Sequence, residues 1–400
     1  MAAAILYLPH AASRALGARP VGGRSLTLRA AVAAARAGAS IVGIPAALRT
    51  PRLEREIRRA PDAARAVRWL DGPAPEPGFT ERPCLLLPVT MLAEAWSLRV
   101  LLEPGGEPEG AVLAGTAARG APALSAPPAF VQKLWDRLAA GQPLGEELTL
   151  QAGRVSAVGE PAAAAPLIVR READLAEAEA RLYARLGTDN DTGVDRFLHR
   201  RCSLPLTRVL VRTPATPNQV SLASLAVGGG AIWCFWQATP GSALLGVLLY
   251  LVASVLDHSD GELARLTFQE SRLGAHLDWA IDTIIHSLLV LAMAVTAGHG
   301  PLALAVGAAG AAGVTLSAFL ARHLPHEIEV GPSVGGGLKN MGNRDLFYLL
   351  LLVFVLLRWL VPALLVGLAL LVAVGSQWYW LACLARIRRL RPAGSSGRGR

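Results

Sequence analysis

Four aspartates stand in two pairs inside the long apolar segments of the second half of the sequence. Asp257 and Asp260 are three residues apart, and Asp278 and Asp282 are four residues apart. In a helix, each of these spacings places both side chains of a pair on one face. An ionised carboxylate at membrane depth costs several kcal/mol of free energy, so such residues usually mark a functional site.

The two pairs predict a site for divalent cations. If their helices form an antiparallel hairpin around residues 262–273, the four carboxylates converge and repel one another unless cations neutralise them. Carboxylate oxygens are hard ligands that suit Mg²⁺ or Mn²⁺, and two such ions could share the site. Ions placed there most naturally serve phosphoryl transfer. The alternatives are a cation pathway in a transporter or channel, and a solvated acidic loop.

The spacing of these residues resembles the signature of the CDP-alcohol phosphotransferase family. The pattern is Asp257-x2-Asp260-Gly261-x2-Ala264-Arg265-x8-Gly274-x3-Asp278-x3-Asp282, which specifies eight positions across 26 residues. The tripeptide Thr216-Pro217-Asn218 looks like a further element of the family. The resemblance covers about residues 195–385, and a pattern of this length makes it very specific.

The resemblance implies a role for each matching position. The expected metal ligands are Asp257, Asp260, Asp278 and Asp282. Asp282 is also expected to be the general base that takes the proton of the acceptor hydroxyl. The residues expected to contact the CDP-linked donor are Gly261, Ala264, Arg265, Ser271, Gly274 and Asn218.

The implied reaction transfers a substituted phosphate from CDP-diacylglycerol or a CDP-polyol to an alcohol and releases CMP, in phospholipid or inositol-phosphate-lipid biosynthesis. The family resemblance also implies a homodimer. No single residue identifies the donor or the acceptor.

Polar residues beside the fourth and fifth apolar segments are candidates for binding the acceptor or the donor head group. They are Arg322, His323, Lys339, Asn343 and Arg344. Ordinary anchoring of cationic residues on the cytoplasmic side explains them about equally well. We expect three nearby histidines to pack between helices rather than to bind a ligand: His258, His276 and His286.

Six apolar segments from about Asn218 onward are expected to span a membrane, and most of them are long enough for a crossing, which takes about 20 helical residues. They cover roughly residues 218–238, 241–262, 274–298, 301–321, 344–361 and 362–385. With six spans, all the connecting segments rich in Arg or Lys fall on one side, which predicts that both termini and the active site are cytoplasmic. Arg358 is the one exception to this charge pattern. The expected location is the cell inner membrane.

The net charge of +9 lies largely beside these apolar segments, which favours lipid head groups over nucleic acid as the partner. Residues 188–214 form a separate basic segment in this prediction. Within it, Val194–Thr213 is expected to be an amphipathic helix in the membrane interface, interrupted near Pro205. The alternative is a solvated basic linker. The spanning domain then covers 215–386, and 387–400 is expected to be a basic disordered tail.

Residues 1–187 have the composition of a soluble domain. Short apolar runs at Ala3–Leu8, Ser40–Pro45, Pro83–Pro88 and Ala111–Ala114 predict strands. Helices are expected at Ser25–Gly38, with Ser25 as N-cap, at Met91–Leu102 and at Glu172–Leu186; Asp71–Thr80 is expected to be a surface loop and Gly187–Gly193 a hinge. Strands that alternate with helices predict a three-layer α/β domain with a mostly parallel sheet.

The soluble domain resembles nucleotidyltransferase-like domains through Pro20–Leu26, and the order of the two domains is similar to that of fused cytidylyltransferase and di-inositol-phosphate synthase enzymes. Two positions depart from that pattern. Pro9–Arg14 replaces a glycine-rich loop, and Val89-Thr90 stands where a metal-binding aspartate is expected. Without these groups the domain is expected to be degenerate and non-catalytic. A bifunctional enzyme, whose soluble half still makes the CDP-linked donor, is the alternative.

Overall fold

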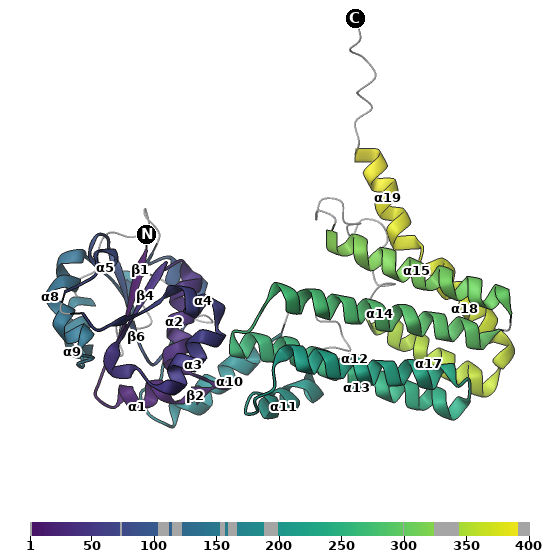
Figure 1. Cartoon of the computed structure of the whole chain (residues 1–400), viewed down its shortest axis with the longest axis horizontal. Coiled ribbons are helices and arrows are strands. Elements are labelled where there is room, and N and C mark those ends of the chain that lie inside the picture. The colour runs from purple at the N-terminus through teal and green to yellow at the C-terminus, as the bar shows by residue number, and fades with distance from the viewer. Residues whose placement is uncertain are drawn as a thin grey trace, which may run out of the picture. The chain divides into compact units, whose positions relative to one another are not determined.

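The computed structural model describes residues 2–72, 74–102, 112–113, 122–152, 157–158, 166–187, 199–298, 300–323 and 344–390 (Figure 1). The chain folds into two compact units. The first contains Met1–Leu186 together with Ala264–Gln269, and the second contains Gly187–Leu263 together with Glu270–Arg400.

A seven-stranded sheet forms the centre of the first unit. Its strands are β1 (Ala3–Tyr7), β4 (Ile41–Pro45), β5 (Val67–Leu70), β6 (Cys84–Pro88), β8 (Val112–Leu113), β9 (Leu124–Ala126) and β10 (Ala157–Val158). Their order is β10-β8-β9-β6-β1-β4-β5. The central strands β6, β1, β4 and β5 are parallel, with Ile5 opposite both Gly43 and Leu86, whereas β9 is antiparallel to its neighbours.

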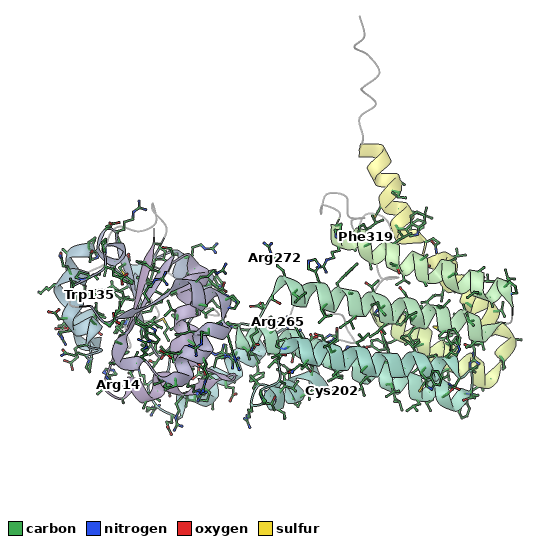
Figure 2. All side chains as sticks on the ribbon, in the orientation of Figure 1. Arg14, Trp135, Cys202, Arg265, Arg272 and Phe319 are labelled. Carbon is green, nitrogen blue, oxygen red and sulfur yellow. The ribbon has the colours of Figure 1, made fainter. Side chains whose placement is uncertain are left out.

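Helices cover both faces of this sheet, as expected. The described helices of the first unit are α1 (Ser13–Ala18), α2 (Leu26–Ala37), α3 (Pro51–Arg59), α4 (Pro61–Ala66), α5 (Pro77–Thr80), α6 (Ala95–Arg99), α8 (Pro128–Ala139), α9 (Gly145–Ala152) and α10 (Asp174–Ala184). In β1, Leu6 packs into the core that contains α2, and Ile5 packs into the core that contains Trp135 of α8 (Figure 2). Both faces of the strand are therefore buried, which is typical of a parallel sheet.

Two expectations for the first unit are wrong. Met91–Leu92 is a short strand, β7, paired antiparallel with β11 (Leu167–Ile168), so the helix at this point begins only at Ala95. Pairing with a distant segment overrides the local helical pattern here. The expected loop 71–80 contains α5, because Phe79 is fully buried beside Trp135. The expected N-cap is confirmed: the Ser25 side chain accepts a hydrogen bond from the Leu28 N–H.

The segment Ala264–Gln269 is held in the first unit by arginines. Arg29, which is 5% exposed, donates hydrogen bonds to the carbonyl oxygens of Val21, Gly22 and Leu266 at 2.7, 2.9 and 2.9 Å. Its guanidinium also lies 5.1 Å from the centre of the Phe268 ring. Burial, and then the neighbouring charge of Arg24, lower the pKa of Arg29 to about 9. The side chain is therefore still a cation at neutral pH.

The second unit is helical and contains the apolar segments. Its helices are α11 (Arg200–Leu210), α12 (Pro217–Trp236), α13 (Pro240–Thr267, whose last residues belong to the first unit), α14 (Arg272–Ala297), α15 (Pro301–His323), α17 (Arg344–Leu360), α18 (Leu365–Gly375) and α19 (Trp378–Leu390). In the described residues, five segments are long and apolar enough to span a membrane: α12, α13, α14, α15 and Pro362–Ala385. The sixth expected span corresponds to α17, whose apolar part, Phe347–Leu360, is shorter.

Small residues allow the helices of this bundle to approach closely. A Cβ atom at Gly228 of α12 would lie 2.4 Å from Ile285 Cδ1 of α14, and one at Gly310 of α15 would lie 2.7 Å from Val290 Cγ1. Both distances are too short for non-bonded carbons. Glycine at these positions therefore permits the packing of α14 against both neighbours.

Helix α11 continues through Pro205, so the expected interruption there is wrong. Proline removes one backbone hydrogen bond, but Ser203 and Thr207 on either side of it are both fully buried and bonded, and they hold the helix together. Most of the expected hinge Gly187–Gly193 and most of the expected tail 387–400 lie outside the described residues.

Candidate metal centre

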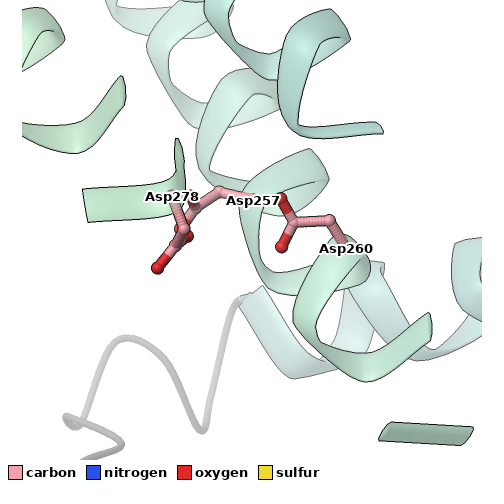
Figure 3. Close-up of side chains that lie close together, drawn as sticks. All are labelled: Asp257, Asp260 and Asp278. Atoms are coloured by element: carbon pink, nitrogen blue, oxygen red, sulfur yellow. The ribbon is translucent and has the colours of Figure 1, made fainter. Parts of the chain in front are cut away.

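Three of the four predicted aspartates converge in the second unit. One carboxylate oxygen from each of Asp257, Asp260 and Asp278 lies within 4.8 Å of the other two (Figure 3). Asp257 and Asp260 come from one face of α13, and Asp278 comes from the first turns of α14. Among the residues that the structure describes, this is the one group of three or more acidic, histidine or cysteine side chains so arranged.

The beginning of α14 is fixed by local contacts. The Ser271 side chain caps the helix by accepting a hydrogen bond from the Gly274 N–H at 2.9 Å. Just before it, Phe268 takes a positive φ of 57°, which ends α13 and turns the chain. These two features set where Asp278 falls relative to the aspartates of α13.

The electrostatics of the cluster favour a bound cation. Asp260 is 5% exposed, and its Oδ2 accepts a hydrogen bond from the Ser221 hydroxyl of α12. A hydroxyl group satisfies one lone pair but brings no positive charge, so three neighbouring carboxylates still repel one another. Their hard oxygen atoms, drawn from two helices, fit the ligand preference of Mg²⁺ or Mn²⁺.

Asp282, predicted as a fourth ligand and as the base, lies one turn beyond Asp278 on α14 and is half-buried. It is outside the group of three oxygens within 4.8 Å. Its backbone carbonyl faces the ring of His286, whose Nδ1 is 2.6 Å away, and His286 Nε2 is 2.7 Å from the Tyr250 hydroxyl. His286 therefore packs between helices, as expected.

Three of the predicted donor-contacting residues lie together. A Cβ atom at Gly274 would be 3.1 Å from Ser271 Oγ and 3.4 Å from Asn218 Oδ1, so the start of α14 adjoins the start of α12. The Thr216 side chain caps α12, and Gln219 completes a reciprocal capping box that fixes Asn218 between them.

The other donor candidates lie further along α13. Gly261 directly follows Asp260. Ala264 and Arg265 belong to the segment counted with the first unit, where Arg265 Nη2 donates to the Leu186 carbonyl at 3.3 Å.

The acceptor candidates are only partly described. Arg322 donates to the Ala275 carbonyl at 3.1 Å, lies 2.9 Å from His276 Nδ1, and stacks 5.1 Å from the Trp279 ring. His323 stacks on Phe319. Lys339, Asn343 and the side chain of Arg344 lie outside the described residues. Arg322 thus fastens the end of α15 to the start of α14.

Sequence reasoning missed two residues beside the aspartates. Ser221 bonds Asp260, and the fully buried Glu262 lies two residues further along α13. A serine in an apolar helix gives no signal by itself. Glu262 did give one, because it is an ionisable residue inside a predicted hairpin of membrane helices.

The first unit contains a pocket of about 440 Å³ at the carboxyl ends of β1 and β4. It is lined by Ala11, Arg14, Ala15, Gly17, Ala18, Ser25, Thr27, Ala47, Leu48, Thr50, Arg52, Leu53 and Glu56. Glu56, the carboxylate in this lining, accepts hydrogen bonds from the Ser25 hydroxyl at 2.6 Å and from Arg52 Nε at 3.1 Å. Val89 and Thr90, at the end of β6, are 0% and 1% exposed.

The membrane half of the chain matches a known family. Residues 214–387 match the family model described as CDP-alcohol phosphatidyltransferase. The match and the five long apolar helices identify an integral membrane protein.

Three curated proteins named "Bifunctional IPC transferase and DIPP synthase" are similar to parts of the chain. The protein of Rubrobacter xylanophilus is 36% identical over 149 residues, which cover 36% of this chain and 33% of the relative. The protein of Archaeoglobus fulgidus is 25% identical over 207 residues, 50% of this chain and 37% of the relative. The protein of Thermococcus kodakarensis is 30% identical over 112 residues, 28% of this chain and 25% of the relative. The chain thus spans less than two fifths of the length of each.

Proposed function

We propose that the protein, whose residues 214–387 match the CDP-alcohol phosphatidyltransferase family, transfers a substituted phosphate from a CDP-linked donor to an alcohol and releases CMP. The observation that carries the proposal is the convergence of Asp257, Asp260 and Asp278. Three converging carboxylates are suited to holding divalent cations, whose positive charge offsets the negative charge of a diphosphate in phosphoryl transfer.

The three converged aspartates, with Asp282 as a fourth, would hold two Mg²⁺ or Mn²⁺ ions. When bound, such ions supply charge that offsets the negative charge of the diphosphate and of the departing phosphate. The residues around them orient the ligands: the Ser221 hydroxyl fixes one oxygen of Asp260, and helix α14 carries Asp278 and Asp282 one turn apart.

Asp282 acts as the general base in this proposal. The acceptor oxygen forms a bond to the phosphorus that carries the alcohol group of the donor, and the bond from that phosphorus to the bridging oxygen breaks. The acceptor proton passes to the Asp282 carboxylate, and the electron pair of the broken bond leaves with CMP. A carboxylate fits this role because a free hydroxyl group is a poor nucleophile at neutral pH.

The donor is bound by two groups of residues. Asn218, Ser271 and Gly274 are close enough to contact one ligand group, and Gly274 leaves room for it. Gly261, Ala264 and Arg265 follow the metal ligands along α13, where small side chains permit close approach and Arg265 supplies a cation for the diphosphate. Arg322, Lys339, Asn343 and Arg344 are the proposed acceptor side.

The donor is CDP-diacylglycerol or a CDP-polyol, in phospholipid or inositol-phosphate-lipid biosynthesis. The resemblance of the domain order to fused cytidylyltransferase and di-inositol-phosphate synthase enzymes favours an inositol-phosphate compound on one side of the reaction. The protein is proposed to act as a homodimer in the cell inner membrane, with both termini and the aspartates on the cytoplasmic side, because the basic connecting segments share that side.

The first unit is proposed to be a degenerate, non-catalytic nucleotidyltransferase-like domain. Glu56 in its pocket is already bonded to Ser25 and Arg52, and the end of β6 offers Val89 and Thr90 rather than a carboxylate. The relatives' name favours a second candidate, a bifunctional enzyme whose first unit makes the CDP-linked donor. Full-length protein carrying Asp257→Asn, incubated with CTP and inositol phosphates, should release no pyrophosphate; pyrophosphate release would establish the bifunctional alternative.

The central test measures CMP release by the full-length protein in detergent with CDP-diacylglycerol or CDP-inositol and a small panel of alcohols. We expect release with one donor, its loss on chelation of divalent ions, and its recovery on addition of Mg²⁺ or Mn²⁺. Asp257→Asn should lower the rate about 100-fold or more. Asp136→Asn, on the exposed side of α8, serves as the control and should leave the rate unchanged. Full activity of Asp257→Asn, or activity in excess chelator, would contradict the proposal.

A further inference from the structure

Glu262 is a fully buried acidic residue on the helix that carries two of the aspartates. It lies in α13 two residues beyond Asp260, is 0% exposed, and is not one of the eight positions of the family signature. A carboxylate in such a place is costly unless its charge and lone pairs are satisfied.

Among the described residues, the side chains that bond the Glu262 carboxylate come from one helix. Arg200 Nη1 donates to Oε1 at 2.6 Å, the Ser203 hydroxyl donates to Oε1 at 2.7 Å, and the Thr207 hydroxyl donates to Oε2 at 2.6 Å. These donors are three and four residues apart along α11, so they line a single face of that helix. Both carboxylate oxygens are therefore bonded to α11.

The burial of Glu262 and the docking of α11 depend on each other. If α11 moved away, a charged carboxylate would remain in a dry site without its partners, which strongly disfavours that movement. Ser203 and Thr207 are also 0% exposed, so they too would lose their partner. This mutual dependence makes α11 a fixed neighbour of α13 rather than a loose surface helix.

Helix α11 contacts α13 close to the proposed metal ligands. Asp260 is held from one direction by Ser221 of α12, and Glu262, half a turn further on, is held by α11. The rotation of α13 about its axis decides whether Asp257 and Asp260 face Asp278. Contacts from two different helices at successive positions fix that rotation.

We propose that Glu262 is a positioning residue. Its hydrogen bonds to α11 hold α11 against α13, and this contact fixes the orientation of the aspartates without Glu262 touching substrate. The inference rests on the proposed function for its kinetic consequence, because the aligned aspartates are taken to serve phosphoryl transfer. Its structural consequences, the immobility of α11 and the affinity of the aspartates for a cation, can be measured without any turnover.

Cys202 provides a native reporter of the docking. It lies on the exposed side of α11 (Figure 2), whereas the remaining cysteines, Cys84, Cys234 and Cys383, are buried. A nitroxide attached to Cys202 of the full-length protein in detergent reports the mobility of α11. Binding of Mn²⁺, followed by its own resonance signal, reports the alignment of the aspartates.

Two sets of variants test the proposal. Glu262→Ala and Thr207→Val remove hydrogen bonds between α11 and Glu262. Thr207→Ser keeps the hydroxyl donor, and Val209→Ala changes the exposed side of the same helix. We expect Glu262→Ala and Thr207→Val to make the nitroxide more mobile and to weaken Mn²⁺ binding about tenfold, in the range found for supporting residues of metal sites. Thr207→Ser and Val209→Ala should match the unaltered protein. If Glu262→Ala does not fold, the comparison of Thr207→Val with Thr207→Ser decides alone.

Unchanged mobility in Glu262→Ala or Thr207→Val would overturn the proposal, and so would greater mobility with unchanged Mn²⁺ affinity. A failure of the proposed function would give a different result, because the unaltered protein would then release no CMP from any donor. The mobility and Mn²⁺ measurements would still test the contact between α11 and Glu262.

Discussion

At the scale of single residues, the metal centre depends on side chains that neutralise or orient one another. The spacing of the aspartates, together with the expected antiparallel hairpin, predicted that all four would converge, and the structure brings Asp257, Asp260 and Asp278 together. Ser221 could not be predicted in the same way. Its contact with Asp260 depends on how α12 and α13 are aligned along their lengths, and that alignment is set by packing.

The Ser221 hydroxyl offers a graded test of this support. Ser221→Ala should lower the rate of CMP release about tenfold, because a hydrogen bond to a charged group contributes about 1.5–3 kcal/mol. Ser224→Ala is the matched control: Ser224 lies one turn further along α12 and bonds the Ala253 carbonyl instead of an aspartate. Equal losses in the two variants would show that α12 packing, and not the bond to Asp260, is responsible.

At the scale of helices and strands, the apolar runs predicted most of the architecture. The parallel strands and the long helices follow from local patterns that tertiary contacts reinforce. The exceptions all involve distant partners. Met91–Leu92 pairs with Leu167–Ile168, Phe79 is buried against Trp135, and Pro205 is carried by a helix whose inner face bonds Glu262. None of these partners is visible in the local sequence.

Adjacent glycines of α12 separate packing from helix propensity. A valine at Gly228 would collide with Ile285, whereas in the described part of the chain no atom beyond the adjoining helix backbone lies within 4 Å of a Cβ at Gly229. Gly228→Val should therefore lower the free energy of unfolding by about 2 kcal/mol, the typical cost of overpacking, and Gly229→Val should not. Thermal unfolding of the detergent-solubilised protein measures both. A similar loss of stability in the two variants would contradict close packing at Gly228.

At the scale of the whole molecule, the order of the sequence and the division into units do not coincide. The boundary at residue 187 stays a prediction from composition, and the first compact unit contains Met1–Leu186 together with Ala264–Gln269. No local pattern indicated that Ala264–Gln269 would belong to the first unit. Arg29 of the first unit contacts both Leu266 and Phe268 of this segment.

Arg29 is the residue that tests this assignment. Arg29→Ala leaves the carbonyls of Val21, Gly22 and Leu266 without their donor, so we expect the first unit to lose about 2–3 kcal/mol of stability and residues 264–269 to exchange amide hydrogens faster. Arg19→Ala removes an exposed ion pair with Glu172 and should cost less than about 1 kcal/mol. Unaltered exchange at 264–269 in Arg29→Ala would remove the argument for Arg29 as the anchor.

Arg358, the one cation that broke the charge pattern, has a role at the end of the bundle remote from the aspartates. Its guanidinium donates to the carbonyls of Ala238 and Thr296 at 2.6 and 2.9 Å, just beyond the end of α12 and near the end of α14. Because Arg358 is bonded to these backbone carbonyls, its position is explained by helix packing and does not indicate which side of the membrane it lies on. Arg358 also joins these ends of α12 and α14, so we expect any separation of the two helices to occur at their opposite ends, where the aspartates lie.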